Sequence, residues 1–379
     1  MIYLDNCATT PMAADVLEAM MPYFSGKFGN ASSSTHAYGW AAAEAVKVSR
    51  EKIANYFGVS AEEVFFTSGA TEGINWVLKG IYDRYQQKGK HIITSRIEHS
   101  AVLDTVKHLE RMGAEVSYVG VNSQGIVNRD ELTRLIRPDT ILVSIMWANN
   151  ETGVIQPVNE ISKICQEAGV FFFSDATQAV GKCETPLGEN GPDLLTFSGH
   201  KLYGPKGIGA VIVRKKRPAI RITPLIDGGG QEQGMRGGTL NVPGIVGLAR
   251  AVERIDSGKW QTWQQMRDDM EKIIIDRLPE VMVVGDGVLR LPGVSNLIIP
   301  GVNTSRLISA LSSKVALSSG SACTSGSLEP SHVLVAMGIS DQYLQSALRI
   351  CLNEMMSKSE LQIALKLIVN ACDTLRKLA

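Results

Sequence analysis

The chain of 379 residues has no long apolar run and no excess of charge of either sign. No segment reaches the ~18 apolar residues that cross a bilayer, so we expect no membrane span. Lys and Arg together number 38, as do Asp and Glu, which leaves no basic field to attract DNA, RNA or anionic lipid. The first residues, Met-Ile-Tyr-Leu-Asp, lack the basic and apolar regions of a secretion signal. These absences predict a cytoplasmic protein that does not bind nucleic acid directly.

Cysteine is scarce and scattered along the chain. The six cysteines contain no Cys-x-x-Cys pair, which argues against a metal site and against a disulfide framework. Five of them have apolar neighbours or lie in regular segments, and we expect these to be small core residues: Cys7, Cys165, Cys183, Cys351 and Cys372. Cys323 differs because it lies in residues 318–327, which include no large apolar side chain. A cysteine on such a loop is either incidental or a nucleophile, and the residues alone leave both open.

Short apolar runs alternate with amphipathic segments over the first two thirds of the chain. We expect strands at residues 64–67, 91–95, 115–119, 140–146, 170–173, 194–197 and 208–213. Between them, we expect helices at residues 13–24, 40–57, 70–85, 129–136 and 158–168. Alternation of this kind predicts an α/β fold with a mainly parallel sheet flanked by helices and right-handed crossovers.

From Pro243 onward this alternation stops. We expect a long helical region to residue 278, short strands near residues 281 and 294–299, a helix over 305–311 and a capped helix over 357–375. The change predicts a large α/β domain of residues 15–250 and a smaller α+β domain. The smaller domain would combine residues 1–14 with residues 251–379 and would carry the Cys323 loop.

A lysine stands in a tight, glycine-rich turn between two expected strands. Lys201 lies within Ser-Gly-His-Lys-Leu-Tyr-Gly-Pro-Lys-Gly, residues 198–207. Because an ammonium group is costly to bury, this lysine is either an exposed loop residue or an amine that attacks a carbonyl. Asp175 follows an apolar run and would lie at the carboxyl end of a parallel strand, where open α/β sheets bind ligands. Pyridoxal phosphate (PLP) needs both groups, a lysine for its aldehyde and a carboxylate for its pyridine nitrogen.

With these motifs the chain resembles the cysteine desulfurases of the NifS/IscS type, in the class V aminotransferase family of fold-type I PLP enzymes. The match extends from Tyr-Leu-Asp-Asn at residues 3–6 to Ser-Ala-Leu-Arg at residues 346–349. The Ser-Ser-Gly-Ser-Ala-Cys-Thr-Ser run around Cys323 is similar to that of the subgroup with a long catalytic loop. The resemblance implies a homodimer that converts L-cysteine to L-alanine and a persulfide on Cys323. The persulfide would pass to an acceptor protein of an iron–sulfur, tRNA-thiolation or DNA-phosphorothioation pathway.

The resemblance also implies roles for individual residues. The catalytic residues would be Cys323, Lys201 and His99, with His99 stacked on the pyridine ring. The PLP-binding residues would be Ala70, Thr71, His99, Asn150, Asp175, Gln178, Ser198, His200, Lys201 and, across the dimer interface, Thr239. The substrate-binding residues would be Asn30, Asn150 and Arg349, and no metal is expected.

Several alternatives stay open from the residues alone. The segment around Asn30 and residues 68–72 could serve only as helix caps. Residues 225–239 could be a flexible linker, and Arg349 could form a structural ion pair in place of a substrate contact. The whole chain could be another PLP lyase or aminotransferase, such as a selenocysteine lyase, or a non-catalytic sulfur-relay partner. Asn353 stands where relatives commonly have glycine. Because the chain stops 30 residues after Arg349, we expect a dedicated sulfur acceptor.

Overall fold

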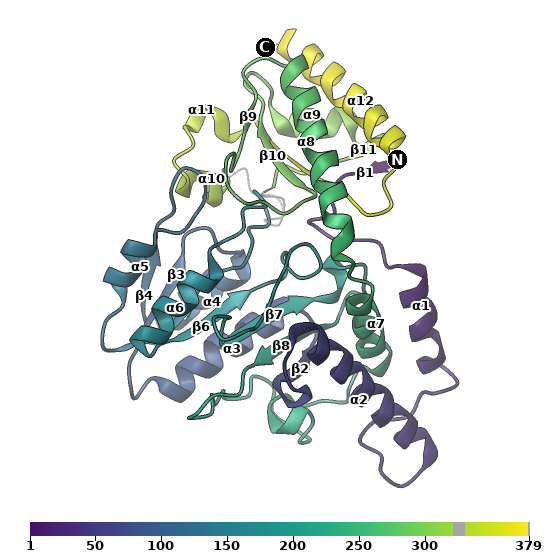
Figure 1. The fold of residues 1–379 in the computed structure, drawn as a ribbon, viewed down its shortest axis with the longest axis vertical. Coiled ribbons are helices and arrows are strands. Elements are labelled where there is room, and N and C mark those ends of the chain that lie inside the picture. Colours follow the sequence, from purple (N-terminus) through teal and green to yellow (C-terminus); the bar gives the residue numbers. More distant parts are fainter. Residues whose placement is uncertain (321–329, 378–379) are drawn as a thin grey trace.

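The computed structural model describes residues 1–320 and 330–377. Within them, the larger sheet has seven strands in the order β2-β8-β7-β6-β5-β3-β4 (Figure 1). These strands are β2 (Val64–Thr67), β3 (His91–Ser95), β4 (Glu115–Val119), β5 (Thr140–Ser144), β6 (Phe171–Asp175), β7 (Leu194–Ser198) and β8 (Gly209–Val213). Strands β3 to β7 pair in parallel, whereas β8 is antiparallel to both β2 and β7. The predicted α/β fold with a mainly parallel sheet is confirmed.

Helices cover both faces of this sheet because its strands are apolar on both sides. Along β7, Leu194 packs into the core beneath one face, and Leu195 and Phe197 pack into the core beneath the other. The first face is covered by α3 (Ala70–Tyr85) and α4 (Ser100–Arg111). The second face is covered by α1 (Ala14–Met20), α2 (Ala37–Phe57), α5 (Arg129–Leu135), α6 (Val158–Ala168) and α7 (Val242–Glu253). Because helices cover both faces of the sheet, the loops that follow its strands meet at the ends of the strands.

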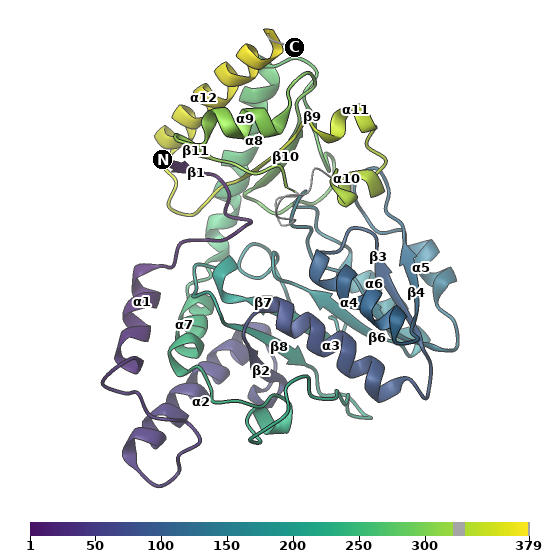
Figure 2. The ribbon, with the colours of Figure 1, turned by 180° about the vertical axis from the view of Figure 1, so that it is seen from behind.

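A smaller group of elements lies beyond one end of the large sheet (Figure 1). Its antiparallel sheet has the order β12-β10-β9, and a separate parallel pair joins β1 to β11. The strands are β1 (Ile2–Tyr3), β9 (Met282–Val283), β10 (Val294–Ile298), β11 (Val315–Ala316) and β12 (Ala347–Cys351). The helices are α8 (Trp260–Arg277), α9 (Thr304–Leu311), α10 (His332–Ala336), α11 (Asp341–Leu344) and α12 (Lys358–Lys377). Figure 2 shows the N-terminal β1 beside α12. Because the first residues lie with the C-terminal elements, we propose one domain of residues 15–250 and a second of residues 1–14 together with residues 251–379.

The helical region expected from Pro243 is interrupted. Helix α7 ends at Glu253 and α8 begins at Trp260, with a short turn between them. The Asp256 side chain accepts a hydrogen bond from the Gly258 N–H (3.0 Å), which favours a turn over a continuous helix. The capping box expected before α12 is present, since Ser357 and Glu360 bond reciprocally. No helix in the described ranges is long and apolar enough to span a membrane.

The prediction that all five structural cysteines are separate core residues is wrong for one pair. Cys7 and Cys351 form a disulfide that links the N-terminal segment to β12, with 5.8 Å between their Cα atoms. The two segments lie side by side because the Cys351 N–H donates to the Leu4 carbonyl at 2.8 Å. A separation of 344 residues gives no local pattern from which this pairing could be read. Of the remaining cysteines, Cys165 and Cys372 are buried and Cys183 is half-buried.

Candidate active site

A cavity of about 630 Å³ opens at the carboxyl ends of the central parallel strands. Its walls come from the loops after β2, β3, β5, β6 and β7, together with the N-terminal segment and β12. The sequence-predicted residues that line it are Ala70, Thr71, His99, Asn150, Asp175, Gln178, Ser198, His200, Lys201 and Arg349. The fold therefore brings together residues that lie up to 279 positions apart, from Ala70 to Arg349.

Lys201 and Asp175 reach this cavity from adjacent strands. Asp175 is the last residue of β6, and Lys201 ends the short 3-10 turn that follows β7. The Asp175 carboxylate accepts hydrogen bonds from the backbone N–H of Thr177 (2.9 Å) and from its hydroxyl group. The Lys201 Nζ donates to the carbonyls of Cys7 (2.6 Å) and Ala8 (2.7 Å). Both charged groups are thus held in place by their neighbours at the cavity wall.

The mouth of α3 offers a site for a phosphate group. Gly69 precedes α3 and provides no side-chain cap, so the first backbone N–H groups of the helix are available to an anion. Gly69 has φ 155°, a backbone conformation that residues with a side chain rarely adopt. A Cβ atom there would lie 3.6 Å from Ser198 Oγ, on the side of Gly69 that faces Ser198. Lys206 lines the same cavity and adds positive charge. Because of its φ angle, position 69 favours glycine where the chain turns into the helix mouth.

Two histidines lie in the cavity wall with different constraints. The His99 Nδ1 accepts a hydrogen bond from the Ala101 N–H (3.1 Å) and caps α4, so its neutral ring carries the proton on Nε2. His200 Nδ1 lies 3.1 Å from the Thr9 hydroxyl oxygen. Burial, and then the nearby Lys201, Lys206 and Lys182, lower the pKa of His200 to about 4. His200 is therefore a neutral hydrogen-bonding group at pH 7.

Arg349 is fully buried on β12 and makes a partial set of hydrogen bonds. Its Nη2 atom pairs with Asp5 Oδ1 at 2.8 Å, and its Nη1 atom donates to the Asn150 carbonyl at 2.9 Å. Its Nε atom is buried and has no hydrogen-bond partner among the described residues. The ion pair left open by the sequence therefore exists, and a further acceptor is still needed for Nε.

Glu98 was not predicted from the sequence as part of the site. It is fully buried after β3, and its Oε1 atom accepts hydrogen bonds from Ser95 Oγ (2.6 Å) and the Met146 N–H (2.9 Å). Burial, together with the nearby Asp175 carboxylate, raises its pKa to about 8. The position of Glu98 directly before His99, after a strand end, could have indicated from the sequence that Glu98 lies near the site. Nothing in the sequence indicated that the Cys7 and Ala8 carbonyls accept hydrogen bonds from Lys201, because every residue has a carbonyl.

Two predicted site residues in the described part of the chain, Asn30 and Thr239, do not line the cavity. Asn30 lies in the exposed loop before α2, where its side chain accepts a hydrogen bond from the Ser32 N–H (2.9 Å). Thr239 is exposed at the end of the glycine-rich segment. That segment is not a free linker, because its buried Glu232 pairs with Arg50 at 2.5 Å. Cys323 lies outside the described residues.

Comparisons with known proteins show which family this chain is similar to. The family model Aminotransferase class-V matches residues 2–363. Proteins named cysteine desulfurase IscS from Rickettsia massiliae and Anaeromyxobacter sp. are each 46% identical over 381 residues, covering 100% of this chain and 92% and 94% of theirs. A NifS-like protein structure is 38% identical with a TM-score of 0.91, covering 98% of this chain and 99% of its own. The structure of SspA in complex with cysteine is also 38% identical, with a TM-score of 0.84 and coverage of 93% and 99%.

Proposed function

The chain belongs to the aminotransferase class-V family and is a PLP-dependent cysteine desulfurase, and we propose that its reaction depends on Lys201, Asp175 and Arg349. The observation that carries this proposal is their meeting in one cavity. The amine and the carboxylate lie at neighbouring strand ends, and the buried Arg349 Nε still needs an acceptor. This is the set of groups that a PLP enzyme acting on an amino acid requires.

The residues present fit PLP. The uncapped N-terminus of α3 with Ser198 suits its phosphate, Asp175 suits the pyridine nitrogen, and Lys201 suits the aldehyde. We assign Ala70, Thr71, Asn150, Gln178 and His200 to the same cofactor, with His99 against its ring. When bound, PLP supplies an electron sink that makes the Cα proton of the substrate acidic.

The chain's own residues then bind the substrate and move its proton. Arg349 and Asn150 would hold the carboxylate of L-cysteine, which would supply the acceptor that Arg349 Nε lacks among the described residues. The Lys201 amine would take the Cα proton, oriented by the carbonyls of Cys7 and Ala8. The Cys323 thiolate would attack the substrate sulfur, breaking its bond to Cβ and forming a sulfur–sulfur bond. L-cysteine and the enzyme thiol thereby give L-alanine and the enzyme persulfide.

A homodimer would complete this site. Large apolar side chains are exposed along the segment from α1 into α2, including Met21, Phe24, Phe28, Tyr38 and Trp40. Phe28 is 64% exposed and Trp40 is 59% exposed, which a monomer in water would not favour. We propose that a second copy covers this surface and that Asn30 and Thr239 serve the site of the partner.

The sulfur of Cys323 would pass to an acceptor protein in the cytoplasm. Relatives of this chain include proteins named cysteine desulfurase IscS and a structure of SspA with cysteine. We infer L-cysteine as the substrate, and an iron–sulfur, tRNA-thiolation or DNA-phosphorothioation pathway as the destination of the sulfur.

The assignment of Lys201 is tested by trapping the cofactor on the chain. We expect borohydride to fix PLP to the parent protein at Lys201 and to leave a Lys201→Ala variant without covalent cofactor. The control is Lys163→Ala, on the exposed face of α6, which should retain the label. PLP fixed to the chain of Lys201→Ala in the parent amount would refute the assignment.

A further inference from the structure

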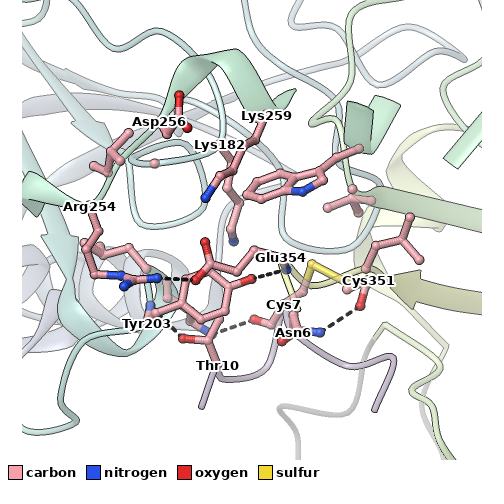
Figure 3. Close-up of a pocket in the computed structure, with 18 of the residues that line it drawn as sticks. Asn6, Cys7, Thr10, Lys182, Tyr203, Arg254, Asp256, Lys259, Cys351 and Glu354 are labelled. Atoms are coloured by element: carbon pink, nitrogen blue, oxygen red, sulfur yellow. Dashed lines mark hydrogen bonds and ion pairs between the residues drawn. A yellow bond between two sulfur atoms is a disulfide. The ribbon is translucent and has the colours of Figure 1, made fainter. Parts of the chain in front are cut away.

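The Cys7–Cys351 disulfide lies directly behind the catalytic cavity. Cys7 lines that cavity, and both cysteines line a second, smaller cavity on its far side. Figure 3 shows the sulfur–sulfur bond in the wall of this second cavity, with Lys182, Tyr203 and Glu354 around it. Disulfides inside cells are commonly transient or redox-sensing, so one at this position calls for a functional explanation.

One end of the disulfide, Cys7, contacts the catalytic amine through its backbone carbonyl. The Cys7 carbonyl accepts hydrogen bonds from both Lys201 Nζ (2.6 Å) and Gln178 Nε2 (2.9 Å). Gln178 is fixed in turn, because its Oε1 atom accepts from Lys182 Nζ at 2.7 Å. A shift of the Cys7 backbone therefore moves one of the two carbonyls that accept hydrogen bonds from the Lys201 amine.

The other end of the disulfide is on the strand that binds the substrate. Cys351 and Arg349 are two residues apart on β12, so their side chains leave the strand on the same face. Asp5, two residues before Cys7, forms a bridge with Cys351 and pairs with Arg349. The disulfide thus adds a covalent link between the segment that supports Lys201 and the strand that carries Arg349.

The sulfur atoms lie where the buried core meets a small cavity that is lined in part by charged side chains. The second cavity measures about 40 Å³, enough for a few water molecules, since each needs roughly 10–15 Å³ by this measure. Its wall includes Lys182, Lys201, Arg254 and Glu354. Small reductants and oxidants acting during local opening would therefore meet the sulfur atoms beside water and charge.

We propose that Cys7 and Cys351 form a redox-sensitive site whose disulfide state tightens binding of the amino-acid substrate. The cross-link restricts the N-terminal segment against β12 and so reduces the ordering required when a carboxylate binds Arg349. Reduction by a dithiol transfers two electrons and two protons, opens the sulfur–sulfur bond to two thiols and leaves the reductant as a cyclic disulfide. The hydrogen bonds of Leu4 and Asn6 to Cys351 keep the two thiols close, which favours closure when an oxidised disulfide reagent is added.

The test measures amino-acid binding in the two redox states. L-alanine is the probe because it carries the carboxylate but no thiol, and its binding is followed by the absorbance of PLP. A Cys323→Ser background removes interference from that cysteine. We expect non-reducing peptide mapping to find Cys7 joined to Cys351, and reduction to weaken L-alanine binding about fivefold or more, reversibly.

Matched variants separate a redox role from a structural one. Adding Cys7→Ser and Cys351→Ser should reproduce the weaker binding and abolish the response to reductant, whereas adding Cys183→Ser should preserve the response. The inference rests on the proposed function, but the two can fail separately. Absence of L-alanine binding in both states would contradict the function. Equal affinity in both states, or free thiols at both positions after oxidation, would overturn the redox site alone.

Discussion

Ionisable groups line or adjoin the catalytic cavity, with Lys201 and Asp175 in its wall and the buried Glu98 near Asp175. Lys201 and Asp175 were candidates from the sequence because each follows an apolar run at a strand end, and the resemblance to a family then predicted their roles. Glu98 has the same position after β3 but was not assigned, since its full burial and its contact with the Met146 N–H depend on the neighbouring strand β5. The hydrogen bonds from Lys201 to two backbone carbonyls could not be predicted, because they join segments about 190 residues apart.

The raised pKa of Glu98 predicts a pH-dependent stability. An unperturbed glutamate, as in the unfolded chain, has a pKa of 4.5, whereas the pKa of Glu98 in the fold is about 8. Between pH 4.5 and pH 8 the folded protein therefore holds one proton more than the unfolded chain does. Folding then takes up a proton, and stability falls as the pH rises from about 5 to about 8. We expect cofactor-free Glu98→Gln to gain stability over the parent across this range, by at most about 3 kcal/mol at pH 7.

Urea unfolding at pH 5 and pH 7.5 measures this effect, with Glu44→Gln on the exposed face of α2 as the control. An advantage of Glu98→Gln that is the same at both pH values would show that Glu98 does not keep its proton in the fold.

The helices and strands differ in how well the sequence predicts them. The bounds of β2, β3 and β4 agree with the sequence prediction because each strand is a compact run ended by turn residues. The break between α7 and α8 was not predicted, since the apolar pattern continues on both sides of it. The close approach of α3 to the sheet was also not predicted, because it depends on the side chains of β7 and β8.

This close approach makes Gly73 a sensitive position. A Cβ atom at Gly73 would overlap Thr196 Oγ1 and lie 2.8 Å from Val211 Cγ2. Overpacking of this kind costs about 1–3 kcal/mol, more than the ~1 kcal/mol that alanine gains over glycine in a helix. Because α3 must move, we expect Gly73→Ala to lower the melting temperature and to weaken PLP binding at the helix mouth.

The matched control is Gly188→Ala, where an added Cβ would meet nothing within 4 Å. Calorimetry and PLP titration of both variants check the prediction, and unchanged PLP affinity in Gly73→Ala would separate α3 from the cofactor site.

At the scale of the whole molecule, the two ends of the chain cooperate in one site. The N-terminal segment continues from β1 to the wall of the cavity, where Asp5 forms a bridge with Cys351 of β12. The sequence prediction grouped residues 1–14 with residues 251–379 but named no contact between them. The Cys7–Cys351 disulfide and the Asp5–Arg349 ion pair could not be predicted from the sequence, because both join residues more than 340 positions apart.

The homodimer is a prediction at this scale. We expect sedimentation velocity to give twice the chain mass of 41.0 kDa for the parent protein. Replacing Phe24 and Phe28 by Asp would place charges in the apolar interface, so we expect the double variant to sediment as a monomer and to lose activity. Leu289→Asp is the control, because Leu289 is 77% exposed on another part of the surface. A fully active parent monomer would contradict the shared site.

The central claim is that sulfur leaves L-cysteine through a thiolate of this chain. The most direct measurement compares the parent with Cys323→Ser, using labelled L-cysteine without reductant and following alanine and protein-bound sulfur. A serine hydroxyl is not ionised near neutral pH, so it cannot replace the thiolate in the attack on sulfur. We predict that the parent forms alanine and carries labelled sulfur on Cys323, whereas the variant binds PLP, changes its spectrum with L-cysteine and forms neither product. Alanine release by Cys323→Ser near the parent rate would contradict the account.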